Sequence, residues 1–136
     1  MVPPDSLPVF QASLERCLGD STFTQRFYAR FLLSSDEVAQ RFAHVDLKRQ
    51  SNVLRSSLYL VLRGAMGYED GREHLENVAH THGRLGIDIP RHLYDYWLDC
   101  LVLAARETDP HFGPDHERHW RACLEPCIAV VTKTHP

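Results

Sequence analysis

Apolar residues recur at helical spacing along nearly the whole 136-residue chain, and this periodicity constrains the fold more than any other feature of the sequence. Between residues 46 and 66, for example, Leu54, Leu58, Val61 and Ala65 stand at i, i+4, i+7 and i+11, so they share one face of a helix. No segment shows the sustained alternation of apolar and polar residues that a half-buried strand requires. The sequence therefore predicts an all-α fold.

Capping residues and breaks divide this pattern into seven or eight helices without a linker or an internal repeat. We expect Asp46 to be the N-cap of the longest helix and Pro90 to lie in the first turn of another. Three glycines between residues 64 and 71 predict a loosened connection before a short helix that ends at His82. The predicted helices lie at 6–18, from 21 or 22 to about 32, from about 36 to 42, 46–66, a short segment ending at 82, 90–104 and 115–132. Residues 1–136 form a single predicted domain.

The composition excludes several classes of partner. With 43% hydrophobic residues the chain can build a sizeable core, and its formal charge of -3, with both signs interspersed, offers no surface for nucleic acid. No window approaches the length of a membrane span, and no basic stretch followed by an apolar run opens the chain. We therefore expect a cytoplasmic protein that binds neither nucleic acid nor membranes.

The four cysteines have two interpretations. Three of them fall within apolar helical stripes, which predicts reduced thiols in the core. A zinc site is the alternative, because two histidines and two of the cysteines lie along one face of the last predicted helix. That face spans about 16 Å at 1.5 Å per residue, which is too long for four ligands of one ion. The cysteines are Cys17, Cys100, Cys123 and Cys127, and the histidines are His116 and His119.

His82 is the candidate of greatest functional interest. On a helix it stands at i+7 from Leu75 and i+4 from Val78, so its imidazole shares a face with apolar side chains. Such a histidine is either a core residue with a hydrogen-bonded ring or a ligand. Tyr28 and Gln50 are two further polar residues on apolar helical faces, and together the three favour a cofactor pocket.

A haem that binds a diatomic gas would explain this set. Haem iron needs one strong axial donor, which neutral His82 can supply. Oxygen bound to the iron acquires negative charge, which hydrogen bonds from Tyr28 and Gln50 can stabilise.

The same residues carry a family resemblance. Residues 27–30, Phe-Tyr-Ala-Arg, and 42–50, from Phe42 to Gln50, resemble the distal half of truncated haemoglobins. Residues 79–87, Ala-His-Thr-His-Gly-Arg-Leu-Gly-Ile, resemble the proximal segment of flavohaemoglobin globin domains and sensor globins. The resemblance to bacterial single-domain globins extends over roughly residues 10 to 132 in the expected helix order. It implies a full three-over-three helical sandwich that binds haem b.

The resemblance also implies a role for each matching residue. His82 would be the proximal iron ligand, Phe42 would wedge against the haem, and Tyr28 and Gln50 would be the distal hydrogen-bond donors. The apolar contacts would come from Leu54, Val78, Ile87 and Ile89, and a propionate partner from Arg84 or His44.

Alternatives stay open for several of these residues. Tyr28 could be a core tyrosine, and Gln50 could point to solvent at the mouth of the pocket. His80 lies about 200° from His82 around the helix, so it would be a surface residue unless the register is wrong and it is the ligand itself. A second protein residue, Tyr28, Gln50 or a displaced His44, could also coordinate the iron when no gas is bound.

The resemblance implies reversible binding of oxygen, nitric oxide and carbon monoxide. Conversion of nitric oxide to nitrate would need a separate reductase, because the sequence continues into no reductase domain. Residues 131–135 also lack the glutamate that tightens the proximal histidine in flavohaemoglobins. The alternative is a gas-sensing or partner-binding globin module without enzymatic turnover, acting through a signalling partner.

Overall fold

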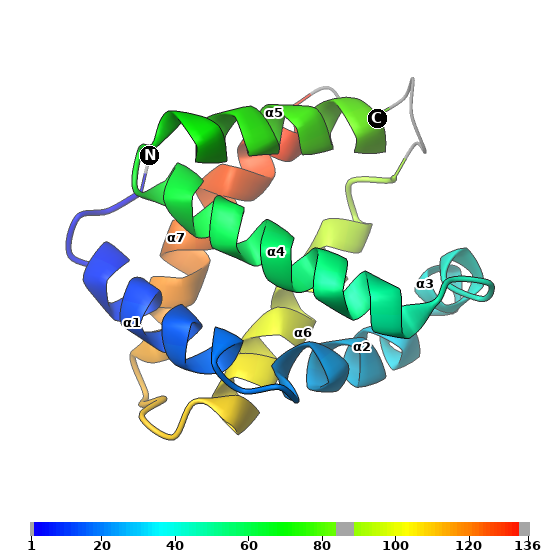
Figure 1. Cartoon of the computed structure of the whole chain (residues 1–136), viewed down its shortest axis with the longest axis horizontal. Coiled ribbons are helices and arrows are strands. Elements are labelled where there is room, and N and C mark those ends of the chain that lie inside the picture. Colours follow the sequence, from blue (N-terminus) through cyan, green and yellow to red (C-terminus); the bar gives the residue numbers. More distant parts are fainter. Residues whose placement is uncertain (1, 84–88, 134–136) are drawn as a thin grey trace.

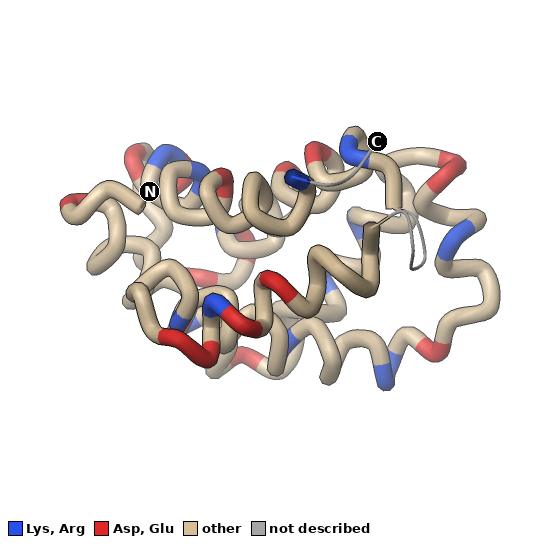
Figure 2. The backbone as a smooth tube through the Cα atoms, turned by 90° about the horizontal axis from the view of Figure 1, so that it is seen from above, with Lys and Arg blue, Asp and Glu red and all other residues tan. Residues whose placement is uncertain are grey.

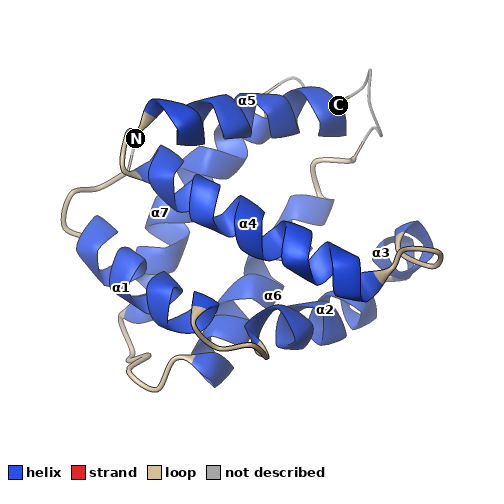
Figure 3. Cartoon of the chain, in the orientation of Figure 1, coloured by secondary structure: helices blue, strands red, loops and turns tan. Residues whose placement is uncertain are grey.

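A computed structural model describes residues 2–83 and 89–133, and within these residues the chain consists of helices and loops (Figure 3). The predicted all-α class is confirmed. The helices are α1 Leu7–Leu18, α2 Phe23–Ser34, α3 Asp36–Arg41, α4 Leu47–Ala65, α5 Glu69–His82, α6 Leu93–Thr108 and α7 His116–Thr132.

Side-chain caps start two of the helices. The Asp46 carboxylate accepts hydrogen bonds from the backbone N–H groups of Lys48 and Arg49 at the start of α4, as predicted. Ser35 accepts from the N–H of Val38 over 3.1 Å and starts α3. These caps fix the sharp turns on either side of α3, the short helix that connects α2 to α4.

The connection between α4 and α5 differs from the prediction. Gly64 lies inside α4 and Gly71 inside α5, so these glycines do not loosen a loop. A Cβ atom on Gly71 would lie 2.0 Å from the backbone nitrogen of Gly64, which means that the absent side chains let two helices cross in close contact. The turn itself uses Gly67, at φ 88°. As a result α5 begins at Glu69 and is a full helix of 14 residues rather than a short one.

The start of α6 also differs. The helix begins at Leu93, three residues after Pro90, whose carbonyl accepts a hydrogen bond from the Leu93 N–H in the preceding turn. Pro90 therefore leads into the helix and is not part of its first turn.

Six helices form two layers (Figure 1). One layer holds α1, α4 and α5, and the other holds α2, α6 and α7. Contacts of α7 with α1, α4 and α5, and of α2 with α4, join them. Phe10 and Trp120, both fully buried, pack edge to face between α1 and α7 with ring centroids 5.0 Å apart. Acidic and basic residues are interspersed along the chain (Figure 2). None of the helices in the described part of the chain has the length and hydrophobicity that a bilayer span requires.

Candidate functional site

A cavity of about 1030 Å³ lies between α4 and α5 and extends to α2, α3, α6 and α7. Aliphatic and aromatic side chains form most of its wall, and residues with polar side chains form the rest. This combination is typical of a site for a large, mostly apolar ligand. Most of the sequence-predicted site residues line this cavity: Tyr28, Phe42, Gln50, Leu54, Val78, His82 and Ile89. Arg84 and Ile87 lie outside the described residues.

His82, the last residue of α5, is half-buried at the wall of the cavity. Its Nδ1 lies 3.1 Å from the hydroxyl oxygen of Tyr94, which comes from the first turn of α6 and also lines the cavity. Burial raises the pKa of Tyr94 to about 12, so the phenol is neutral at pH 7. Tyr94 was not predicted from the sequence. The only signal was its position three residues before Trp97, on an apolar face of the same helix.

Tyr28 and Gln50 meet at the cavity from different helices. Tyr28, in α2, is 5% exposed. Burial raises the pKa of its hydroxyl to about 12, and a hydrogen bond with Gln50 partly opposes that shift. The Tyr28 ring packs against Phe27 and Phe42 at centroid distances of 4.9 and 5.8 Å. The tyrosine is therefore held by aromatic neighbours, and its polar end faces the amide of Gln50.

Cationic residues at the mouth of the cavity were missed by sequence reasoning. Arg41, at the end of α3, and Arg49, in the first turn of α4, are exposed and line the cavity as well. Both arginines belong to segment 41–50, but the turn between α3 and α4 decides whether their side chains reach the same cavity. His44 is exposed and is absent from the cavity wall, and the same is true of His80, which is a surface residue as predicted.

A second pair of residues that sequence reasoning missed joins α4 to α5 at the cavity. Ser57 Oγ of α4 lies 2.8 Å from His74 Nε2 of α5, and both residues line the cavity. Burial lowers the pKa of His74, which favours its neutral form. The contact joins the two walls, and its residues lie 17 positions apart in the sequence.

All four cysteines are buried and free. Burial raises the pKa of Cys17 and Cys123 to about 12 and that of Cys127 to about 11, which keeps them as thiols. Within the two described ranges, no three side chains of histidine, cysteine, aspartate or glutamate gather into a metal site.

Comparison with known proteins identifies the family. No protein-family model matches the chain, and no curated protein matches its sequence. A solved structure does match: a Pseudomonas aeruginosa protein described as structurally highly homologous to a human hemoglobin. The two chains are 30% identical over 96% of this chain and 98% of the other, with a TM-score of 0.89. The chain belongs to the globin family.

This assignment confirms the predicted globin fold, and a hemoglobin-like fold indicates that the chain binds haem. The residues of this globin fit such a group. The cavity offers an imidazole on α5, hydrogen-bonding groups on α2 and α4, mostly apolar walls and two guanidinium groups at its mouth. A metalloporphyrin needs an axial donor, an apolar enclosure and cations for its propionates.

Proposed function

We propose that the protein holds haem b in the cavity between α4 and α5 and binds oxygen and other diatomic gases reversibly. The observation that carries this proposal is the arrangement of three polar groups in one largely apolar cavity. His82 lies on one side, on α5, whereas Tyr28 and Gln50 come together from α2 and α4. Haem would need a protein ligand to its metal, and hydrogen-bond donors near the bound gas would tune how the gas is held.

His82 would be the iron ligand, through Nε2, because Tyr94 engages Nδ1. With Nε2 toward the metal, Nδ1 carries the proton and donates it to the Tyr94 hydroxyl. This hydrogen bond would fix the tautomer and the orientation of the imidazole ring. Arg41 and Arg49 would bind the propionates at the mouth, and Phe42, Leu54, Val78 and Ile89 would supply apolar contacts.

Tyr28 and Gln50 would donate hydrogen bonds to the bound gas. The raised pKa of Tyr28 keeps its hydroxyl protonated at neutral pH, so it can act as a donor. Donors to a gas that carries partial negative charge slow its release.

We further propose reaction with nitric oxide. Haem held by His82 would supply the chemistry that binds oxygen and oxidises nitric oxide to nitrate, and repeated turnover would need one electron per nitrate from a separate donor. The residues of this chain would hold the gas and limit access of water, since most of the cavity wall is apolar.

The experiment is spectroscopic. The purified protein should show a Soret band and a pyridine haemochrome spectrum of haem b, and His82→Ala should lose haem. In stopped-flow measurements, Tyr28→Phe should release oxygen at least about tenfold faster, because one charge-assisted hydrogen bond is lost. Tyr59→Phe removes the hydroxyl of an exposed tyrosine of α4 and should leave the rate unchanged. An unchanged rate in Tyr28→Phe would remove that residue from gas binding.

A further inference from the structure

A second cavity lies behind the tyrosine of the proposed gas site. It has a volume of about 750 Å³ and lies between the α1–α2 turn, α2 and the first half of α4. Tyr28 and Asn52 line both cavities. These two side chains are therefore the wall between the second cavity and the one assigned to haem.

The second cavity is cationic and rich in hydrogen-bonding groups. Lys48 and Arg55 supply two positive charges, and no aspartate or glutamate occurs among the described residues that line it. Thr24, Ser51 and Asn52 add two hydroxyl groups and an amide. A hollow with positive charge, several donors and no carboxylate in its wall favours an anion over a cation.

The hydrogen-bond acceptors of Arg55 are neutral. Its guanidinium donates hydrogen bonds to the backbone carbonyls of Leu18 and Asp20, the second over 3.2 Å. The side chain of neighbouring Asp20 accepts hydrogen bonds from the N–H and hydroxyl of Thr22 and is absent from the cavity wall. The positive charge of Arg55 is thus positioned at the cavity by hydrogen bonds to backbone carbonyls. The Asp20 carboxylate, whose pKa is lowered by hydrogen bonds from Thr22 and by the charges of Arg26 and Arg55, offsets part of that charge from outside the cavity wall.

We propose that this second cavity binds nitrate or nitrite, small planar oxyanions with a single negative charge. The planar guanidinium of Arg55 matches such an anion, and Lys48 supplies a second charge at the entrance. The choice of a nitrogen oxyanion rests on the proposed reaction, because nitrate would form on the other side of the Tyr28–Asn52 wall.

The test is a nitrate titration of the haem-loaded ferrous protein in its carbon monoxide complex, followed by amide NMR shifts. Sodium chloride at equal ionic strength is the reference. Nitrate should give saturable shifts at residues 48–55, and Lys48→Gln should weaken its binding about tenfold. Arg72→Gln is the matched control, because it removes one exposed positive charge from α5, outside both cavities, and should bind as the wild type does. Arg55→Gln should weaken binding further.

If Arg55→Gln disturbs the α1–α2 turn, Lys48→Gln still tests the proposal, because the Lys48 side chain is exposed at the cavity. Shifts no larger than those with chloride, or unchanged binding in Lys48→Gln, would overturn the proposal. Tighter binding of inorganic phosphate at the same residues would overturn it as well. The carbon monoxide complex needs no turnover, so nitrate binding without nitric oxide conversion would refute only the proposed reaction, and conversion without nitrate binding would refute only this site.

Discussion

Tyr94 is the residue whose importance was least visible before the structure. It reaches His82 from the neighbouring helix, so it acts on the proposed iron through another residue. A hydrogen bond accepted from the Nδ1–H of a metal-bound imidazole makes that imidazole a stronger donor. Tyr94 is therefore a positioning residue for His82.

We predict that Tyr94→Phe keeps its haem but lowers the iron–histidine stretching frequency of the ferrous, gas-free protein. The phenyl ring fills the same space, whereas the Tyr94 hydroxyl that contacts Nδ1 is removed. Resonance Raman spectroscopy measures this directly. Tyr96→Phe, two residues along α6 at an exposed position, is the control and should leave the frequency unchanged. An identical frequency in Tyr94→Phe would mean that the contact does not act on the iron.

At the scale of elements, the crossing of α4 and α5 sets the width of the cavity. The backbones of the two helices are in direct contact at Gly64 and Gly71, and the Leu75 side chain beside Gly64 lines the cavity. Because the helices are rigid, separating them at this crossing would also move apart the residues of α4 and α5 that line the cavity. The glycines therefore influence how the site is shaped at a distance.

Gly71→Ala should destabilise the protein by about 2–4 kcal/mol, because the new methyl group overlaps backbone atoms that cannot rotate away. Urea unfolding followed by circular dichroism measures the free energy of unfolding. The control is Gly19→Ala, whose Cβ would make only ordinary contacts of 3.5 Å, and it should change stability by less than about 1 kcal/mol. Equal stability of the two variants would show that α4 and α5 do not require the close crossing.

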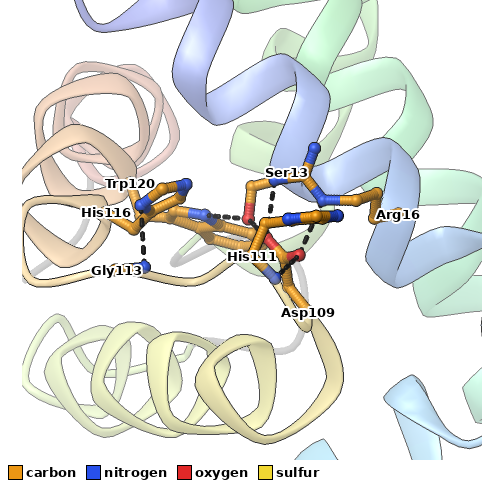
Figure 4. Close-up of polar contacts among 7 residues, drawn as sticks. All are labelled: Ser13, Arg16, Asp109, His111, Gly113, His116 and Trp120. Carbon is orange, nitrogen blue, oxygen red and sulfur yellow. Dashed lines mark hydrogen bonds and ion pairs between the residues drawn. The ribbon is translucent and has the colours of Figure 1, made fainter.

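At the scale of the whole molecule, one buried carboxylate ties α1 to the α6–α7 connection (Figure 4). Asp109 accepts hydrogen bonds from Ser13 at 2.6 Å and from Arg16 at 2.6 and 2.9 Å. Trp120 of α7 donates to Ser13 over 3.0 Å, so the network also includes α7. Burial acts to raise the pKa of Asp109, but the hydrogen bonds from Arg16 and Ser13 outweigh it and lower the pKa to about 2.

This shift predicts how stability depends on pH. Because the pKa of Asp109 is lower in the folded state than its ordinary value of 3.8, its contribution is present above pH 4 and is lost as the pH falls toward 2. A difference of this size corresponds to about 2 kcal/mol. Asp109→Asn should lower the free energy of unfolding at pH 7 by roughly that amount, and the deficit should shrink between pH 4 and pH 2.

Urea unfolding at a series of pH values would check this dependence. Asp99→Asn removes an exposed carboxylate that pairs with Arg121 at 2.8 Å and should cost less than about 1 kcal/mol at any pH. A deficit in Asp109→Asn that stays constant down to pH 2 would contradict the assigned pKa.

The helices were largely predictable because helix formation depends on the local periodicity of apolar residues and on capping residues. Asp46 and the break before α7 were placed correctly, since a cap and a turn depend on a few consecutive residues. The start of α5 was not predicted. In the sequence, Gly71 indicates the end of a helix. In the structure it lies inside α5, where its missing side chain lets the backbone of α4 pass close beside it.

By itself, the sequence determined the all-α class, the family and seven of the residues that line the cavity, including His82, Tyr28 and Gln50. Each of these three residues shares a helical face with apolar residues, and that spacing can be recognised in the sequence alone. Only the tertiary structure paired Tyr94 with His82, Ser57 with His74 and Asp109 with Arg16, and only it placed Tyr28 between two cavities. These contacts depend on how closely and at what angle helices cross, which packing of the whole core decides.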